Sequence, residues 1–168
     1  PSRYELKDAV EFTIYDTDEY TYTYDCVNTV KTGLLQVQKT SEDDVVDGLY
    51  FEISCAETGF NEKVSTDLEG LSPEISDLPI YNSNDELLKY KVTELGELNE
   101  DGTYSLPYKY NKPKSVTVTL NSDTVVFANI KNTLKTGSVK LTKTDGTKAL
   151  TGSGWQLYKS DDTPISCY

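Results

Sequence analysis

Apolar and polar side chains alternate along most of this chain, which is the pattern of β-strands whose two faces meet different surroundings. The segment LLQVQK, residues 34–39, puts Leu35, Val37 and Lys39 on one face of a strand, because successive side chains of a strand point to opposite sides. This face is apolar except for Lys39. If its neighbours lie in the core, the Lys side chain is buried with them.

A second segment repeats this arrangement with an acid in place of the Lys. In LLKYKVTEL, residues 87–95, Tyr90, Val92 and Glu94 share one face, so Glu94 points inward if the other two do. Alternation alone does not decide the matter, since a Lys or a Glu near the end of a strand usually reaches solvent.

The remaining pattern predicts an all-β protein. Further strands are expected at 49–57, 78–81, 116–120 and 124–132, and a hairpin with an acidic turn at Asp16 to Glu19 opens the chain. The strands at 116–120 and 124–132 are expected to pair as a hairpin. Residues 58–79 are polar and turn-rich, and the strand at 78–81 begins where this segment ends. Strands that recur every 8–12 residues or so without intervening helices indicate a β-sandwich.

A short motif occurs twice and suggests how the chain is divided. The sequence NT(V/L)KTG begins at Asn28 and again at Asn132, and in both copies a Lys follows the glycine by six residues, Lys39 and Lys143. A separation of roughly 100 residues suits a repeated β domain better than a short solenoid unit. This predicts parts of three tandem domains: the end of one at 1–31, a complete one at 32–134 and the start of a third at 135–168.

Composition narrows the possible functions. The chain has 28 acidic and 16 basic residues, a net charge of −12, no His and three Cys among its 168 residues. This charge opposes binding to nucleic acid or anionic membranes, and no run approaches the roughly 18 apolar residues of a membrane helix. The lack of His and the spacing of the Cys argue against a zinc site or a Cys/His nucleophile. No metal or cofactor is expected.

Two further features bear on function. The acidic runs at 42–44 and 161–162 do not have the ligand spacing of a calcium loop and are expected to be solvated turns. Tyr104, Tyr108 and Tyr110, interleaved with Lys, form an aromatic and basic loop that would suit a glycan or an acidic partner. The alternative is an edge strand protected by Lys and Pro. Without a convergent polar pocket, an enzyme that turns over substrate is not expected.

Several of these residues follow an order found in a known family. The matching positions are Gly33 and Lys39, Gly48 and Phe51, Asp77-Leu78-Pro79-x-Tyr81, Tyr90-x-Val92-x-Glu94, and Asn132 before the next Gly. This order resembles the Cna B-type domain of Gram-positive surface proteins and pilins, and the opening PSRYEL resembles part of the related SpaA-type pilin domain. The segment 137–162 resembles the first two strands of such a domain, with Trp155 at the position of Phe51.

The resemblance implies a fold and a location. It implies tandem immunoglobulin-like (prealbumin-like) β-sandwich domains in the stalk of an adhesin or pilin attached to the cell wall, on the extracellular cell surface. The expected partners are neighbouring repeats of the same chain and a host matrix protein or glycan. The alternative is an adhesive module that binds a carbohydrate or host protein and has no internal cross-link.

The resemblance also implies a chemistry. Many members of the family form a spontaneous isopeptide bond between a Lys on the first strand and an Asn on the last, assisted by a buried acid, which here are Lys39, Asn132 and Glu94. The Lys must be neutral to attack and the acid must hold a proton, and burial favours both neutral forms. No external cofactor is needed. The partial units carry their own candidates, Asn28 and Lys143.

The choice of Asn has an alternative. The family commonly has an aromatic residue two positions before the reactive Asn, which Phe127 provides for Asn129, whereas Ile130 precedes Asn132. Asn132, however, keeps the position that Asn28 has in the first copy of the motif. The two side chains face opposite sides of a regular strand, so only one of them can meet Lys39. We expect Asn132.

Overall fold

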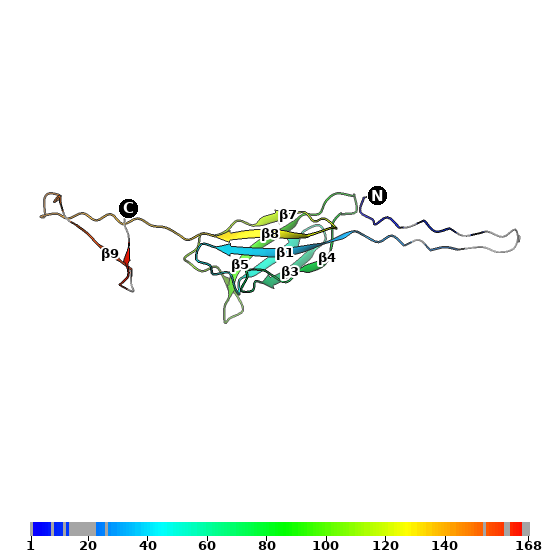
Figure 1. The fold of residues 1–168 in the computed structure, drawn as a ribbon, viewed down its shortest axis with the longest axis horizontal. Coiled ribbons are helices and arrows are strands. Elements are labelled where there is room, and N and C mark those ends of the chain that lie inside the picture. Colours follow the sequence, from blue (N-terminus) through cyan, green and yellow to red (C-terminus); the bar gives the residue numbers. More distant parts are fainter. Residues whose placement is uncertain are drawn as a thin grey trace. The chain divides into compact units, whose positions relative to one another are not determined.

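The computed structural model describes residues 2–7, 9–11, 13, 23–25, 27–152, 154–159 and 162–165. The chain divides into two compact units, Pro1–Lys135 and Thr136–Tyr168 (Figure 1). The regular elements in the described residues are all β-strands. The prediction of an all-β protein is therefore confirmed. The assignment of these units to tandem repeats stays a prediction.

Most strands are short and belong to the first unit. They are β1 (Thr32–Ser41), β2 (Tyr50–Cys55), β3 (Phe60–Ser65), β4 (Ile75–Pro79), β5 (Tyr90–Leu98), β6 (Tyr104–Ser105), β7 (Val116–Val118), β8 (Val125–Asn132), β9 (Leu157–Tyr158) and β10 (Pro164–Ile165).

One sheet of the first unit joins the beginning of the domain to its end. Its strand order is β4-β1-β8. β1 runs antiparallel to β4 and parallel to β8, with Val37 opposite Ala128 and Ser41 opposite Asn132. The arrows of β1 and β8 point the same way in Figure 1. The chain therefore enters β1 at one end of this sheet and leaves β8 at the other.

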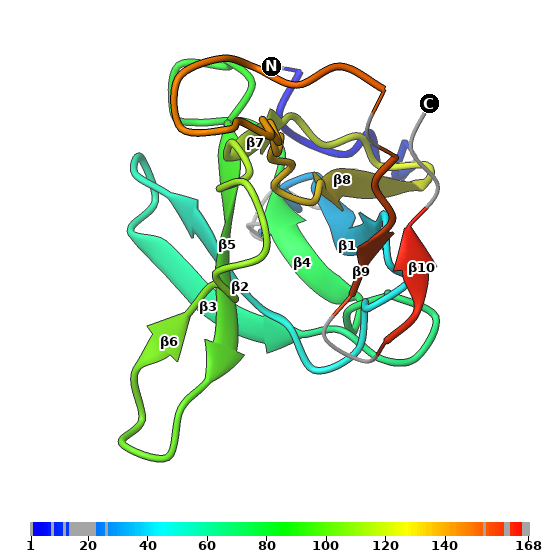
Figure 2. The ribbon, with the colours of Figure 1, turned by 90° about the vertical axis from the view of Figure 1, so that its left-hand side faces the viewer.

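The second sheet has the order β3-β2-β5-β6, and β7 also pairs with β5. Figure 2 shows the two sheets as separate layers. The apolar cluster between them takes side chains from both, among them Leu35 and Val37 from β1 and Phe51, Ile53 and Val92 from β2 and β5. Alternation of buried and exposed side chains along β1 and β2 makes this sandwich.

Two predictions about the strands were wrong. The strands at 116–120 and 124–132 do not form a hairpin, because β7 pairs with β5 whereas β8 pairs with β1 in the opposite sheet. The chain crosses between the layers at Leu120 and Asn121. Leu120 is buried, and the carbonyl of Asn121 packs so close to Gly33 that a side chain at position 33 would collide with it. The segment 58–79, predicted to be polar and turn-rich, contains the strand β3. Only Val64 of this strand is buried, so the strand does not show an alternation of apolar and polar residues.

The ends of the chain add little regular structure. Tyr4 and Val30 form a bridge, but the turn predicted at Asp16 to Glu19 lies outside the described residues. In the second unit β9 pairs with β10, and Trp155 is exposed. Cys55 is buried in β2, as expected for a small apolar residue, and the other two cysteines lie outside the described residues.

Candidate functional site

Lys39 lies in the core of the sandwich. It shares the inward face of β1 with Leu35 and Val37, as the alternation predicts, and only 1% of its surface is exposed. Its backbone N–H donates to the carbonyl of Gly70 at 2.7 Å, which fixes the end of β1 against the loop after β3. A Lys amine this deeply buried needs a partner.

Glu94 supplies that partner from the opposite sheet. It lies on β5 opposite Phe51, and its side chain is inaccessible to solvent. The pairing with β2 shifts register just beyond it, where Tyr50 faces Gly96. Gly96 has a φ of 95°, a conformation that side chains disfavour. The irregularity falls next to Glu94, as is common where a sheet positions a functional side chain.

Asn132 completes the cluster as the last residue of β8. It is fully buried and lies opposite Ser41 at the end of β1. Its backbone carbonyl accepts a hydrogen bond from the N–H of Glu42 at 3.2 Å. The parallel pairing of β1 and β8 thus brings residues more than 90 positions apart in the chain to the same end of one sheet.

The three side chains meet at one carboxylate. Lys39 Nζ donates to Glu94 Oε2 at 2.7 Å, and Asn132 Nδ2 donates to Glu94 Oε1 at 2.8 Å. Within the described residues Asn132 Oδ1 has no hydrogen-bond partner, although it is buried. Burial lowers the pKa of Lys39 and outweighs the opposing effect of Glu94. Burial therefore makes the amine of Lys39 easier to deprotonate than it is in water, and the amide of Asn132 bonds to the same carboxylate.

The other predicted cross-linking residues lie elsewhere. Asn129 is exposed on β8, and its amide donates to the carbonyl of Phe127 at 3.5 Å. Asn28 and Lys143 are both exposed and belong to different units. Of the two candidates on β8, Asn132 is the one that shares the carboxylate of Glu94 with Lys39.

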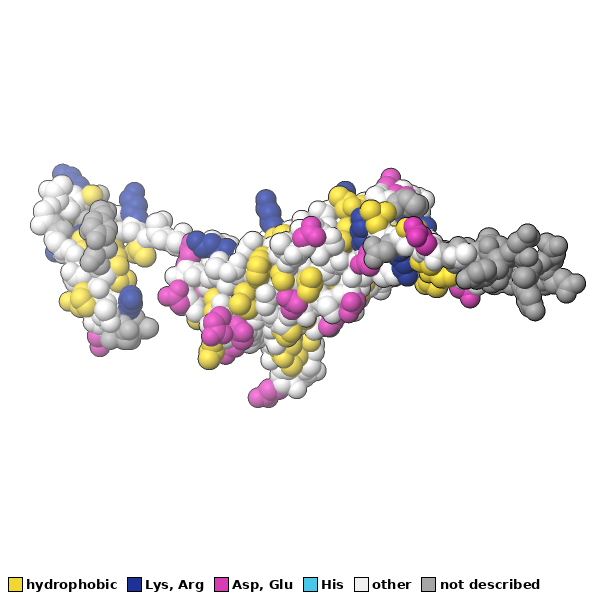
Figure 3. All heavy atoms as spheres, turned by 45° about the vertical axis from the view of Figure 1, so that its right-hand side comes forward, with side chains coloured by type: hydrophobic (Ala, Val, Ile, Leu, Met, Phe, Trp, Pro, Cys, Tyr) yellow, Lys and Arg dark blue, Asp and Glu magenta, His cyan; other side chains and the backbone are white. Residues whose placement is uncertain are grey.

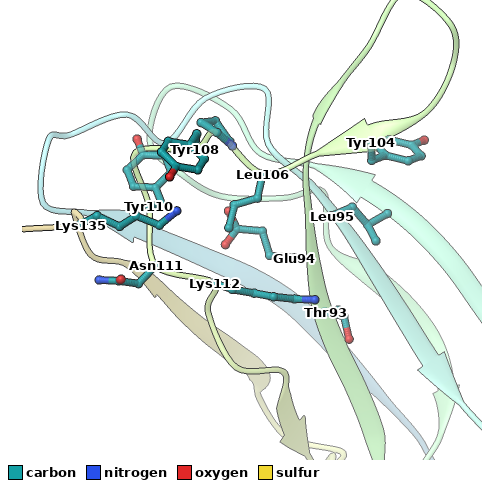
Figure 4. Close-up of a pocket in the computed structure, with 11 residues that line it drawn as sticks. Thr93, Glu94, Leu95, Tyr104, Leu106, Tyr108, Tyr110, Asn111, Lys112 and Lys135 are labelled. Carbon is teal, nitrogen blue, oxygen red and sulfur yellow. The ribbon is translucent and has the colours of Figure 1, made fainter.

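The predicted aromatic loop does not form one exposed surface. Tyr108 is 89% exposed and Tyr104 half-buried, but Tyr110 is 1% exposed. The three line a pocket of about 590 Å³ together with Glu94, Leu106 and Lys135 (Figure 4). The amine of Lys135 lies 3.8 Å above the ring of Tyr108. The pocket thus lies beside the buried cluster, with Glu94 in common.

Sequence reasoning missed the role of Asp43, which was expected in a solvated turn. Its carboxylate accepts hydrogen bonds from Lys109 at 2.7 Å, from Ser41 at 2.6 Å and from the hydroxyl of Tyr110 at 2.8 Å. The hydrogen bond from Lys109 contributes most, and the one from Ser41 next, to a pKa of Asp43 that lies well below its ordinary range. The only signal in the sequence was its place just after the strand that carries Lys39.

Other kinds of site find little support in the residues described. They contain no group of three potential metal ligands, and none of their structure is a helix long and apolar enough to cross a membrane. On the side of the first unit shown in Figure 3, acidic side chains are spread over the surface with Lys and Arg side chains between them.

Comparison with known proteins gave matches in structure only. No family model matches the chain, and no curated protein does. Among 19 matching solved chains are the Bacillus anthracis TIE protein (TM-score 0.46, 23% identity, 64% of this chain and 17% of that one), the minor pilin GBS52 of Streptococcus agalactiae (0.47, 16%, 69% and 51%), and the shaft pilin SpaA of Lactobacillus rhamnosus GG (0.45, 16%, 79% and 62%).

This chain is therefore similar in structure to Gram-positive pilin subunits at low identity. It spans less than two thirds of the length of each of these solved chains. At these identities and TM-scores the similarity assigns no function to this chain.

Proposed function

We propose that residues 32–134 form a load-bearing domain in the stalk of a bacterial cell-surface protein, a pilin or an adhesin, and that Lys39 and Asn132 join in an isopeptide bond with Glu94 as the proton shuttle. The domain is a structural element, and its only chemistry is this single intramolecular step. It would work outside the cell, next to further domains of the same chain.

One observation carries the proposal: the amine of Lys39 and the amide of Asn132 bond to the two oxygens of the same buried carboxylate. An ion pair alone would explain Lys39 and Glu94, but not a fully buried amide held against the same acid. Replacing a buried ion pair by apolar residues is often neutral or stabilising, so stability alone gives little reason for this cluster.

The reaction follows from these contacts. A proton passes from Lys39 Nζ to Glu94 along their hydrogen bond, which leaves a neutral amine and a carboxylic acid. The lone pair of Nζ attacks Cγ of Asn132, and the bond electrons of the carbonyl move onto Oδ1. A second proton of Nζ then passes by way of Glu94 to Nδ2. The electron pair on Oδ1 re-forms the carbonyl as the Cγ–Nδ2 bond breaks, and ammonia leaves. Glu94 returns to the carboxylate when ammonia departs as ammonium.

The unpartnered carbonyl oxygen fits this sequence of steps. The O and N atoms of an Asn amide are assigned from their hydrogen bonds, and a half-turn of the Asn132 amide brings Oδ1 to Glu94. Once protonated, Glu94 donates to this oxygen and stabilises the negative charge that develops on it during attack. The same carboxyl thus activates both reactants in turn.

The position of the bond suits a mechanical role. Tension enters the domain at the start of β1 and leaves at the end of β8, because the two strands are parallel neighbours. A covalent bond from Lys39 to Asn132 carries that tension from one strand to the other near their C-terminal ends. The residues between them are then bypassed by the load.

Mass spectrometry of variants tests the roles assigned. The wild-type chain is expected to weigh one ammonia less than its sequence mass, and Lys39→Ala and Glu94→Ala to fold but keep the sequence mass. Asn129→Ala is the matched control on the same strand and is expected to lose ammonia as the wild type does. Loss of ammonia from the Glu94 variant removes Glu94 from its role, and failure of the Asn129 variant alone assigns the bond to Asn129.

A further inference from the structure

A loop closes the end of the sandwich at which the buried cluster lies. Residues 106–112 leave β6 in one sheet and reach the chain that leaves β8 in the other. There the N–H of Asn111 donates to the carbonyl of Thr133 at 2.9 Å, and the N–H of Lys135 donates to the carbonyl of Lys109 at 2.7 Å. This loop spans the two layers next to Glu94.

Tyr110 is the buried residue of this loop. It is 1% exposed, yet it is not part of the main apolar cluster between the sheets. It forms a bridge with Leu134 and lines the pocket beside Glu94 (Figure 4). Its hydroxyl donates to Asp43, with 2.8 and 3.0 Å to the two carboxylate oxygens. A tyrosine bonded in this way has a fixed ring position.

The residues around Asp43 contact both reacting strands. Ser41, the last residue of β1, donates to Asp43. Glu42 donates its N–H to the carbonyl of Asn132 and accepts the N–H of Leu134 at 2.8 Å. The loop that anchors Tyr110 is thus the one that ties the end of the Lys39 strand to the end of the Asn132 strand.

From these contacts we infer that Tyr110, anchored by Asp43, is a positioning residue for the cross-linking of Lys39 to Asn132: it holds loop 106–112 over Glu94 and keeps water from the reacting groups. The inference rests on the proposed function. Water at the site would stabilise the charged forms of Lys39 and Glu94 and hinder the proton transfer that starts the reaction. Among the described residues, Glu94 from β5 pairs with Lys39 and Asp43 pairs with Lys109. Lys112 and Lys135 line the pocket together with Glu94 and Tyr110.

The rate of ammonia loss after refolding of the full chain tests this role. Tyr110→Phe keeps the ring and is expected to slow the reaction roughly tenfold, the factor that one hydrogen bond to a charged group can contribute. Asp43→Asn combined with Tyr110→Phe is expected to be no slower than the slower single variant, because both remove the same contact. Tyr104→Phe, at the same pocket, is the control and should react at the wild-type rate. A wild-type rate for Tyr110→Phe overturns the inference.

The dependence of the rate on pH separates positioning from general loss of stability. With the site closed, the proton moves within the Lys39–Glu94 pair, so the wild-type rate is expected to be flat between about pH 7 and about pH 10. In Tyr110→Phe, water holds Lys39 in its charged form, and the rate should rise with pH over this range. A flat profile in the variant contradicts the assigned role.

A labelling experiment keeps this inference separate from the proposed function. In Asn132→Ala, Lys39 cannot be cross-linked, and its modification by acetic anhydride reports access to the amine. Adding Tyr110→Phe is expected to speed that modification at least severalfold, whereas adding Tyr104→Phe should not. If the wild type never loses ammonia, the proposed function fails, and the labelling rate of Lys39 still tests whether Tyr110 closes the site. Equal labelling in all three variants refutes that closure.

Discussion

The cross-link should make its largest measurable contribution to the stability of the first unit, and Asn132→Ala is the most informative change. This variant cannot form the bond but keeps Lys39 paired with Glu94. The bond closes a loop of about 90 residues, for which the loop-entropy estimate is about 4.6 kcal/mol, reduced by any strain in the folded state. For a domain of this size, 1 kcal/mol corresponds to about 4–8 °C, so the variant is expected to unfold some 20–35 °C below the wild type.

Thermal and denaturant unfolding followed by circular dichroism measure this difference. Asn129→Ala, an exposed position on the same strand, is the control and should change the free energy of unfolding by less than about 0.5 kcal/mol. Part of the effect of Asn132→Ala comes from the lost amide itself, about 1 kcal/mol. If the wild type has lost ammonia and yet its free energy of unfolding lies within about 1 kcal/mol of that of Asn132→Ala, the cross-link does not stabilise the domain through loop entropy.

Three other predictions follow from the same geometry. In Asn132→Ala, Lys39 stays a free amine whose pKa is lower in the folded state than in the unfolded state, so the unfolded chain binds more protons. The stability of this variant relative to the wild type should therefore rise as pH increases toward the ordinary Lys pKa. Urea midpoints of the two proteins that differ by the same amount from pH 7 to about pH 10 contradict this. Gly70→Ala should slow cross-linking and destabilise the fold, because Gly70 has a φ of 76° and a side chain there would collide with the carbonyl of Lys39. An unchanged rate of ammonia loss together with an unchanged urea midpoint speaks against that contact. Under single-molecule pulling from the chain ends, the wild type should lack the extension of the bypassed residues that Lys39→Ala shows, and equal extensions rule out the load path.

The inward faces of the strands were predictable because residues that point into the core are apolar at every second position of the sequence. Lys39 follows Leu35 and Val37 at alternate positions, and Glu94 follows Tyr90 and Val92 in the same way, so each had a defined side of its strand. What alternation does not contain is which strands are neighbours. The approach of Lys39 to Asn132 was expected only through the family resemblance. It depends on the parallel pairing of β1 with β8, which no pattern in the sequence predicted.

The errors have the same origin. A three-residue connection favours a hairpin locally. Here the chain crosses to the other sheet instead, with Leu120 buried and the carbonyl of Asn121 packed against Gly33, where a side chain would collide with it. β3 is an edge strand with a single buried residue, so its pattern is that of a polar loop. The contact of Asp43 with Tyr110 joins two loops 67 positions apart, and neither segment carries a local signal of it.

The bond between Lys39 and Asn132 is the central feature of the proposed domain, and peptide mass spectrometry of the wild-type chain tests it. After digestion, the peptide that contains Lys39 and the peptide that contains Asn132 are expected to appear as one branched species, lighter than their sum by one ammonia, with fragments that assign the branch to these two residues. Recovery of both peptides separately at their full sequence masses, from a folded and fully digested sample, would contradict the proposed function.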